Sequence, residues 1–140
     1  MGGCGKTHLA VAMLRNAEIH RISGAFFITV PEMLLKIRGA FSAGAEATEE
    51  EIVERFSGYE ILILDDLGSE KTTEWSLTTL FLILDRRDRY CRRTIVTSNL
   101  SLREIEEILG ARIASRLAGM NPIEILMPDL RKNRPPNGPQ

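Results

Sequence analysis

The sequence has few cysteines, almost no net charge and no long apolar run. Its two cysteines, Cys4 and Cys91, form neither a CxxC pair nor a Cys/His cluster. This disfavours a zinc site or a disulfide framework and indicates a reducing, cytoplasmic compartment. No apolar run approaches the ~20 residues that span a bilayer, so we expect no membrane partner. The formal net charge of -1 gives no overall attraction to DNA, which would have to bind at a local basic patch.

The remaining composition is that of one ordinary globular domain. With 140 residues, 44% hydrophobic and 26% charged, the chain can form a single core. Apolar runs that predict strands alternate with amphipathic segments that predict helices, which indicates a three-layer α/β fold with a parallel sheet. We expect this domain over residues 1–128 and a flexible tail over 129–140. We expect strands over 25–30, 61–66, 94–99 and 123–127, with Pro31 closing the first of them. We expect one helix that starts at Lys6 or Thr7 and others over 48–56, around 77–84, over 101–109 and over 111–117. Thr48 with Glu51 three residues on forms a capping-box pattern at the start of the 48–56 helix.

The stretch GCGKTH near the start matches the second half of a phosphate-binding loop. That loop has a glycine, four free residues and then Gly-Lys-Ser/Thr. Gly5, Lys6 and Thr7 supply the last three positions, and the first glycine would lie one position before Met1. Because such a loop connects a strand to a helix, we expect the sheet to lack the strand that precedes the phosphate loop.

This loop predicts a polyphosphate site at a helix N-terminus. Glycines let the backbone approach the phosphates, and the helix dipole adds a partial positive charge there. Lys6 is expected to reach the β and γ phosphates, and the Thr7 hydroxyl to hold a magnesium ion. A Gly-Lys-Thr string also occurs by chance in other loops, so the interpretation depends on the acidic motif that follows it.

Two adjacent acids, Asp65 and Asp66, end the most apolar strand. Ligands bind at the carboxyl ends of the strands in open α/β sheets, so we expect Asp65 to hold the metal and Asp66 to orient or deprotonate a water. The alternative is a turn with a helix-capping acid, and the upstream Gly-Lys-Thr favours the functional interpretation. Asn99 ends the next strand, where its amide is expected to position the attacking water, although such an asparagine alone is more often a turn residue.

Three segments carry a family resemblance: GCGKTHLA, ILILDDLGSEKTTEW and RRTIVTSNLSLREIEEILGARIASRL. In this order they resemble the AAA+ ATPases of the DnaC/IstB type, which are bacterial helicase loaders and transposition helper ATPases. The resemblance implies a five-stranded parallel sheet, with ATP and magnesium bound at subunit interfaces. It assigns Asp65 and Asp66 to the acidic strand motif and Asn99 to the polar sensor. It assigns the phosphate loop to Gly3, Cys4, Gly5, Lys6, Thr7 and His8.

The family also places an arginine on the helix after the sensor, where it reaches the ATP of a neighbouring subunit. Arg116 is the best match and Arg112 the fallback. A guanidinium supplied in trans stabilises the charge that spreads over the γ phosphate. The alternative, which periodicity alone favours, is that both arginines line the solvent face of an amphipathic helix. Arg131 also resembles a family position, without a firm role.

DNA contacts are predicted at two basic segments. The stretch RRDRYCRR (86–93) contains five arginines, but it ends a helix, where cations complement the dipole, so a structural role is at least as well supported as phosphate contacts. In the family, the region after the second strand is linked to single-stranded DNA. Lys36 and Arg38 are the candidate phosphate partners in that region.

The chain departs from the family pattern at its start and at Asp66. The family's partner-binding N-terminal region, the strand before the phosphate loop and the first glycine are not in the sequence, and Asp66 replaces the glutamate usual in many AAA+ enzymes. We expect a truncated reading frame, with little ATPase activity in the isolated chain. Restoring an upstream strand and the first glycine should restore that activity.

The resemblance implies an ATPase that hydrolyses ATP with Mg2+ and assembles as a homo-oligomer on single- or double-stranded DNA. It would act as a helicase loader with a replicative helicase or as a transposition helper with a transposase. The rival hypothesis is a truncated, non-catalytic remnant that acts as an interaction module by offering its arginine-bearing face to an intact homologue. A metabolic phosphate-loop kinase is a third option, but no segment predicts the acceptor-binding lid that it needs.

Overall fold

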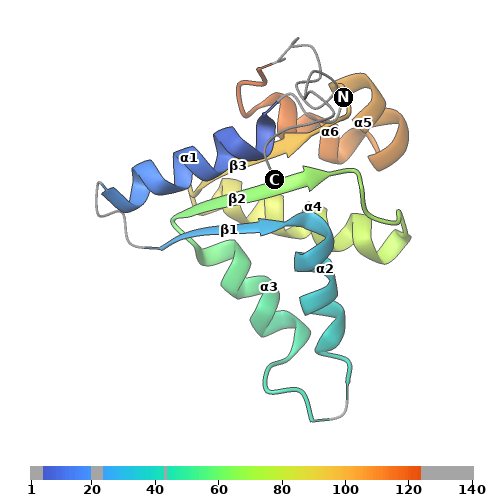
Figure 1. Cartoon of the computed structure of the whole chain (residues 1–140). Coiled ribbons are helices and arrows are strands. Elements are labelled where there is room, and N and C mark those ends of the chain that lie inside the picture. Colours follow the sequence, from blue (N-terminus) through green and yellow to red (C-terminus); the bar gives the residue numbers. More distant parts are fainter. Residues whose placement is uncertain (1–4, 20–23, 43, 124–140) are drawn as a thin grey trace, which may run out of the picture.

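The computed structural model describes residues 5–19, 24–42 and 44–123. Within them lies a parallel sheet in the order β1 (Ala25–Thr29), β2 (Ile61–Leu67), β3 (Arg93–Ser98). Helix α1 (Lys6–Ile19) covers one face of this sheet, and α2 (Val30–Gly39), α3 (Glu49–Gly58) and α4 (Glu74–Arg89) lie on the other (Figure 1). The predicted three-layer α/β fold is therefore confirmed.

The central strand β2 explains why the sequence shows an unbroken apolar run. Ile61 and Ile63 pack with Ala10 of α1, whereas Leu62 and Leu64 belong to the larger core on the opposite face. A parallel strand with helices on both faces needs apolar side chains at every position rather than at alternate ones. All four of these β2 residues are buried.

The predicted helices form, with their ends set by capping residues. Thr48 begins α3 with the predicted capping box: its hydroxyl accepts a hydrogen bond from the Glu51 N–H, and the Glu51 carboxylate accepts one from the Thr48 N–H. Ser101 caps α5 (Leu102–Leu109) in the same way, and Gly110 separates it from α6 (Ala111–Ala118). Helices α5 and α6 pack against each other, and α6 also packs on α4 (Figure 1).

The segment after β1 is where the sequence prediction was wrong. The strand was expected to cover 25–30 and to be closed by Pro31, with a polar, amphipathic section after it. Instead β1 ends at Thr29, whose hydroxyl accepts a hydrogen bond from the Glu32 N–H at 3.3 Å and begins α2. Proline suits the first turn of a helix because the N–H that it lacks has no intrahelical partner there. Pro31 therefore starts a helix rather than simply closing a strand.

A buried arginine joins α4 to the amino end of the sheet. Arg87 has no solvent-exposed surface, and its guanidinium lies where α3 ends and β2 and β3 begin. Burial lowers its pKa to about 10, so the side chain still carries its charge at neutral pH. Its hydrogen-bond acceptors are the carbonyl oxygens of Phe56, Ser57, Tyr59 and Arg93 and the hydroxyl of Thr94.

Several predictions fall on residues outside the described ranges. They concern the tail over 129–140, Arg131, Gly3 and Cys4, and all but the first residue of the expected strand at 123–127. Ile123 itself is described and has no regular structure. Among the described residues, no helix is both long and apolar enough to cross a bilayer.

Candidate phosphate and metal site

Gly5 and the first turn of α1 form the phosphate side of the site. Gly5 has a φ of +86°, in the left-handed region that glycine adopts at little cost. Its carbonyl accepts the first hydrogen bond of the helix, from the Leu9 N–H at 2.8 Å. The first N–H groups of any α-helix have no intrahelical acceptor and attract anions. Helix α1 begins at Lys6, as predicted, so the Gly-Lys-Thr residues lie where a phosphate can meet these groups.

The Thr7 hydroxyl meets the Asp65 carboxylate directly. Thr7 Oγ1 donates to the two carboxylate oxygens of Asp65, at 3.0 Å and 3.2 Å. Asp65 is 4% exposed, at the carboxyl end of β2. Two residues predicted to share a magnesium ion, 58 positions apart in the sequence, therefore lie in contact.

These two groups fit a magnesium ion that also has phosphate and water ligands. Mg2+ prefers oxygen donors and is usually bound by one or two carboxylates together with substrate phosphates. Thr7 and Asp65 supply a hydroxyl and a carboxylate at the place where a phosphate would lie. In the part of the chain that the structure describes, no group of three or more His, Cys, Asp or Glu side chains could hold a metal ion. A cation here would thus need the nucleotide to complete its coordination.

Asp66 has an unusual backbone conformation. Its φ is +64°, a left-handed value that is uncommon outside glycine and that aspartate tolerates better than most residues. The pairing of β2 with β3 shifts between Leu64 and Leu67, so regular pairing is interrupted at the acidic pair. Asp66 is half-buried, whereas Asp65 is buried.

The structure adds Thr97, a residue that the sequence prediction missed. Its hydroxyl donates to the Asp65 carboxylate at 2.5 Å and accepts a hydrogen bond from the Asp66 N–H at 3.0 Å. In the stretch TSN (97–99), only Asn99 was predicted to belong to the site. Asn99 directly follows β3 and is exposed. The pairing register of β2 and β3 identifies Thr97. Because Ile63 of β2 faces Ile95 of β3, the residue two positions after Ile95 lies opposite the acidic pair.

The predicted trans-acting arginine is held by α4 of its own chain. Arg116 pairs with Asp85 at 2.6 Å and with Asp88 at 3.1 Å. Arg112 lies over the Phe81 ring, with its guanidinium carbon 3.8 Å from the ring centroid, and Arg116 lies 5.8 Å from it. Both arginines therefore contact α4, while Arg112 is exposed to solvent and Arg116 is half-buried.

The two basic segments differ in how their charges are used. In RRDRYCRR, Arg87 is buried, and Arg86 pairs with Glu50 and Glu54, a contact that raises the pKa of Arg86. These contacts support the structural interpretation of that stretch. Lys36 and Arg38 are exposed on α2 and lie over the rings of Phe26 and Trp75, at 5.9 Å and 4.9 Å respectively.

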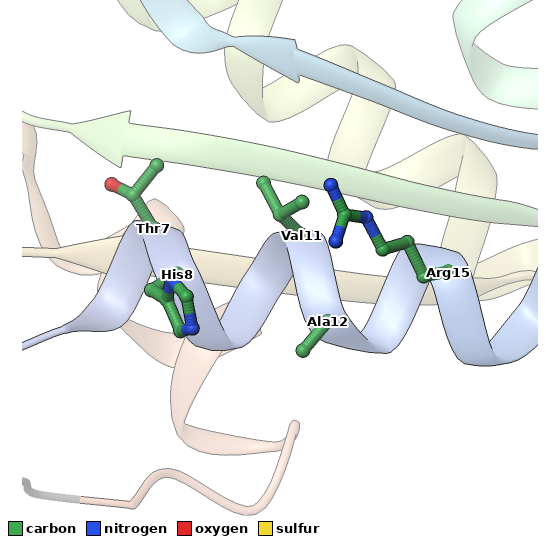
Figure 2. Close-up of a pocket in the computed structure, with 5 residues that line it drawn as sticks. All are labelled: Thr7, His8, Val11, Ala12 and Arg15. Atoms are coloured by element: carbon green, nitrogen blue, oxygen red, sulfur yellow. The ribbon is translucent and has the colours of Figure 1, made fainter.

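A shallow hollow of about 340 Å³ lies along α1. Figure 2 shows its lining residues, which follow the helix from the phosphate side of the site toward the middle of α1. Its lining includes Thr7 and His8 of the predicted phosphate loop and does not include Asp65. The lining residues are Thr7, His8, Val11, Ala12 and Arg15.

The chain has the phosphate-loop fold of the AAA+ class. A parallel sheet, a glycine-led helix N-terminus and an acidic strand end meet at one edge of it. The family model for the IstB-like ATP binding protein matches residues 1–117. The chain therefore belongs to the IstB-like ATP-binding protein family.

Relatives and solved structures agree with this assignment. The replicative helicase loader DnaC of Buchnera aphidicola subsp. Schizaphis graminum is 30% identical over 115 residues, which cover 82% of this chain and 46% of that protein. DnaC of Escherichia coli (strain K12) is 27% identical over a stretch of equal length. The chain thus spans about half the length of the curated relatives it matches.

The crystal structure of the DnaC helicase loader superposes with a TM-score of 0.74 at 28% identity, covering 87% of this chain and 72% of that chain. AMPPCP-bound DnaA from Aquifex aeolicus has a TM-score of 0.73 at 21% identity, covering 85% and 36%. At that identity DnaA supports the fold alone.

Proposed function

We propose that the chain is an ATP-binding module that hydrolyses ATP with magnesium and helps to load a replicative helicase onto DNA. The observation that carries this proposal is the contact between Thr7 and Asp65 across 58 positions of sequence. A hydroxyl from a glycine-led helix N-terminus and a buried carboxylate from a strand end suit a magnesium–triphosphate. The helicase is chosen over a transposase because the matching curated relatives named above are replicative helicase loaders.

The proposed roles follow from the contact between Thr7 and Asp65 and from where the other residues lie along α1, β2 and β3. When bound, a magnesium ion would neutralise charge on the β and γ phosphate oxygens. Thr7 and Asp65 would hold that ion, and Lys6 would bind the phosphates from the first turn of α1. Asp66 and Asn99, at the carboxyl ends of β2 and β3, would orient the attacking water. Gly5 and His8 complete the described part of the loop.

Arg116 is proposed to act on the nucleotide of another copy. Helix α4 runs from the carboxyl edge of the sheet back to the amino edge, where it precedes β3. Asp85 lies about 16 Å along α4 from its start, at a rise of about 1.5 Å per residue. Because Asp85 and Asp88 hold Arg116 there, the guanidinium lies away from the Asp65 site of its own chain. A homo-oligomer would bring it to a neighbouring site.

Nucleotide binding tests the proposal. A fluorescent ATP analogue is titrated into the unsubstituted chain, Lys6→Ala and Lys71→Ala, each with magnesium and with EDTA. Lys71→Ala is the control because Lys71 is an exposed lysine between β2 and α4. A charge-assisted contact contributes about 1.5–3 kcal/mol, so Lys6→Ala should weaken binding about 10- to 100-fold. Equal affinity of all three chains, or no binding, would refute the proposal.

Two further measurements separate the rival functions. Pull-downs with a purified replicative helicase and a purified transposase compare the two proposed partners, and capture of the transposase alone would favour the transposition helper. Turnover is then measured for the chain and for its mixture with a longer relative. Binding without turnover, together with altered turnover of the relative, would favour the non-catalytic module.

The exposed Lys36 and Arg38 are the proposed DNA contacts, to be tested by alanine substitution.

A further inference from the structure

Thr97 joins the two acidic residues through a single hydroxyl. As donor, its Oγ1 reaches the Asp65 carboxylate at 2.5 Å, and as acceptor it receives the Asp66 N–H at 3.0 Å. The same carboxylate oxygen of Asp65 also accepts from Thr7, at 3.2 Å. Asp65 is therefore held between α1 and β3, with hydroxyl groups on both sides.

The hydroxyl lies where the ladder between β2 and β3 is interrupted. Leu64 pairs with Val96 and Leu67 pairs with Ser98, so Asp65 and Asp66 together face the single residue Thr97. Two residues against one is the arrangement of a β-bulge, which re-aims side chains and is over-represented next to active sites. The Thr97 side chain gives the Asp66 N–H a hydrogen-bond acceptor within this interruption.

The bulge also explains how two adjacent acids avoid the core. In a regular strand the residue after Asp65 would point to the opposite face, where Leu62 and Leu64 pack. Instead Leu67 takes the next core position, with 2% exposure. Asp66 is the extra residue, at a φ of +64°. A carboxylate is thereby kept out of the apolar layer, where burial of an unpaired charge is costly.

We propose that Thr97 is the positioning residue of the acidic motif, fixing the bulge at Asp66 and orienting Asp65 toward the magnesium–nucleotide. The metal half of this inference rests on the proposed function; the bulge half does not. Hydrogen-bonding partners of metal-ligating carboxylates orient those ligands, and their removal typically costs about 10- to 100-fold in metal affinity or activity.

Thr97→Val tests the inference because it removes the hydroxyl and keeps the shape of the side chain. Thr97→Ser restores the hydroxyl and is the rescue variant. Ser98→Ala is the matched control: its hydroxyl is the neighbour on β3, and within the described residues its hydrogen bonds are with the Leu67 carbonyl and the Leu100 N–H. Thermal unfolding of each chain confirms that the variants fold.

The first readout is hydrogen exchange of the Asp66 amide, measured by NMR without nucleotide. Thr97→Val should accelerate this exchange at least about tenfold, the equivalent of about 1.4 kcal/mol, while Thr97→Ser and Ser98→Ala should leave it near the unsubstituted rate. Unchanged exchange in Thr97→Val would overturn the anchoring role, because the amide would then have another acceptor.

The second readout is the gain in nucleotide affinity on adding magnesium. Thr97→Val should reduce this gain about tenfold and leave the affinity in EDTA unchanged, with Thr97→Ser close to the unsubstituted chain. If the unsubstituted chain gains affinity and Thr97→Val gains as much, the orienting role is overturned and the proposed function stands. If the unsubstituted chain shows no gain, both the proposed function and the orienting role fail, and hydrogen exchange alone decides the anchoring role.

Discussion

Replacing Arg87 with methionine should destabilise the chain strongly while leaving its surface charge pattern otherwise unchanged. The guanidinium is fully buried and donates to acceptors at the end of α3, ahead of β2 and in β3. Methionine preserves most of the apolar stem but leaves these acceptors without their donor. A buried acceptor that loses its partner costs about 1–3 kcal/mol, and Arg87→Met leaves several such acceptors unpaired at once.

We therefore expect Arg87→Met to lower the free energy of unfolding by about 3–5 kcal/mol, a large part of the about 5–15 kcal/mol of a typical domain. Urea titration followed by circular dichroism measures this, and the control is Arg89→Met on the same helix turn. Arg89 is 63% exposed, and among the described residues its ion pair is with Asp85, so its loss should cost no more than about 1 kcal/mol. Equal midpoints for the two variants would refute the assigned role of Arg87.

Three further outcomes are expected. Gly68→Ala should cost about 1–3 kcal/mol in urea titrations, because Gly68 has a φ of +93° and an added Cβ would lie 2.4 Å from Leu100 Cδ1; an unchanged midpoint would contradict this. The capping contacts lower the pKa of Glu51 below its ordinary 4.5, so the stability that its carboxylate contributes is complete above pH 4.5 and is lost as the pH falls through the lower pKa of the folded state. The difference in unfolding free energy between the unsubstituted chain and Glu51→Ala should therefore shrink in acid. A pH-independent difference would show that the charge is irrelevant. In ATPase assays of the chain extended by an upstream strand and the first glycine, the Arg116→Ala and Lys6→Ala variants should each be inactive but recover turnover when mixed, because one retains the phosphate site and the other the arginine; activity of Arg116→Ala alone would exclude the trans role.

Periodicity and capping patterns predicted most of the fold because they report local geometry. The apolar run of β2 and the capping box at Thr48 each specify an element without reference to distant residues. Helix α2 was missed because Pro31 was interpreted as the end of a strand, although proline also suits a helix start. The structure decides between these interpretations: Thr29 accepts the Glu32 N–H, and Val30 belongs to the helix rather than to the strand.

The site could be predicted where a sequence motif indicates its chemistry. The glycine-led loop and the acidic pair indicated that Thr7 and Asp65 belong together, and the structure places them in contact. The role of Thr97 depends on an interrupted strand register, which only the paired strands reveal. The contacts of Arg116 with Asp85 and Asp88 depend on the packing of α6 against α4, which helical periodicity does not specify.

The central claim is that a cation–nucleotide complex binds between Thr7 and Asp65. Paramagnetic broadening tests it directly: Mn2+ replaces Mg2+ together with a non-hydrolysable ATP analogue, and amide NMR signals are recorded along the chain. The account predicts selective broadening at Thr7, Asp65 and Thr97, with the signals of Tyr90 and Arg92, near the amino end of β3, preserved. Broadening centred elsewhere, or none at saturating nucleotide, would contradict it.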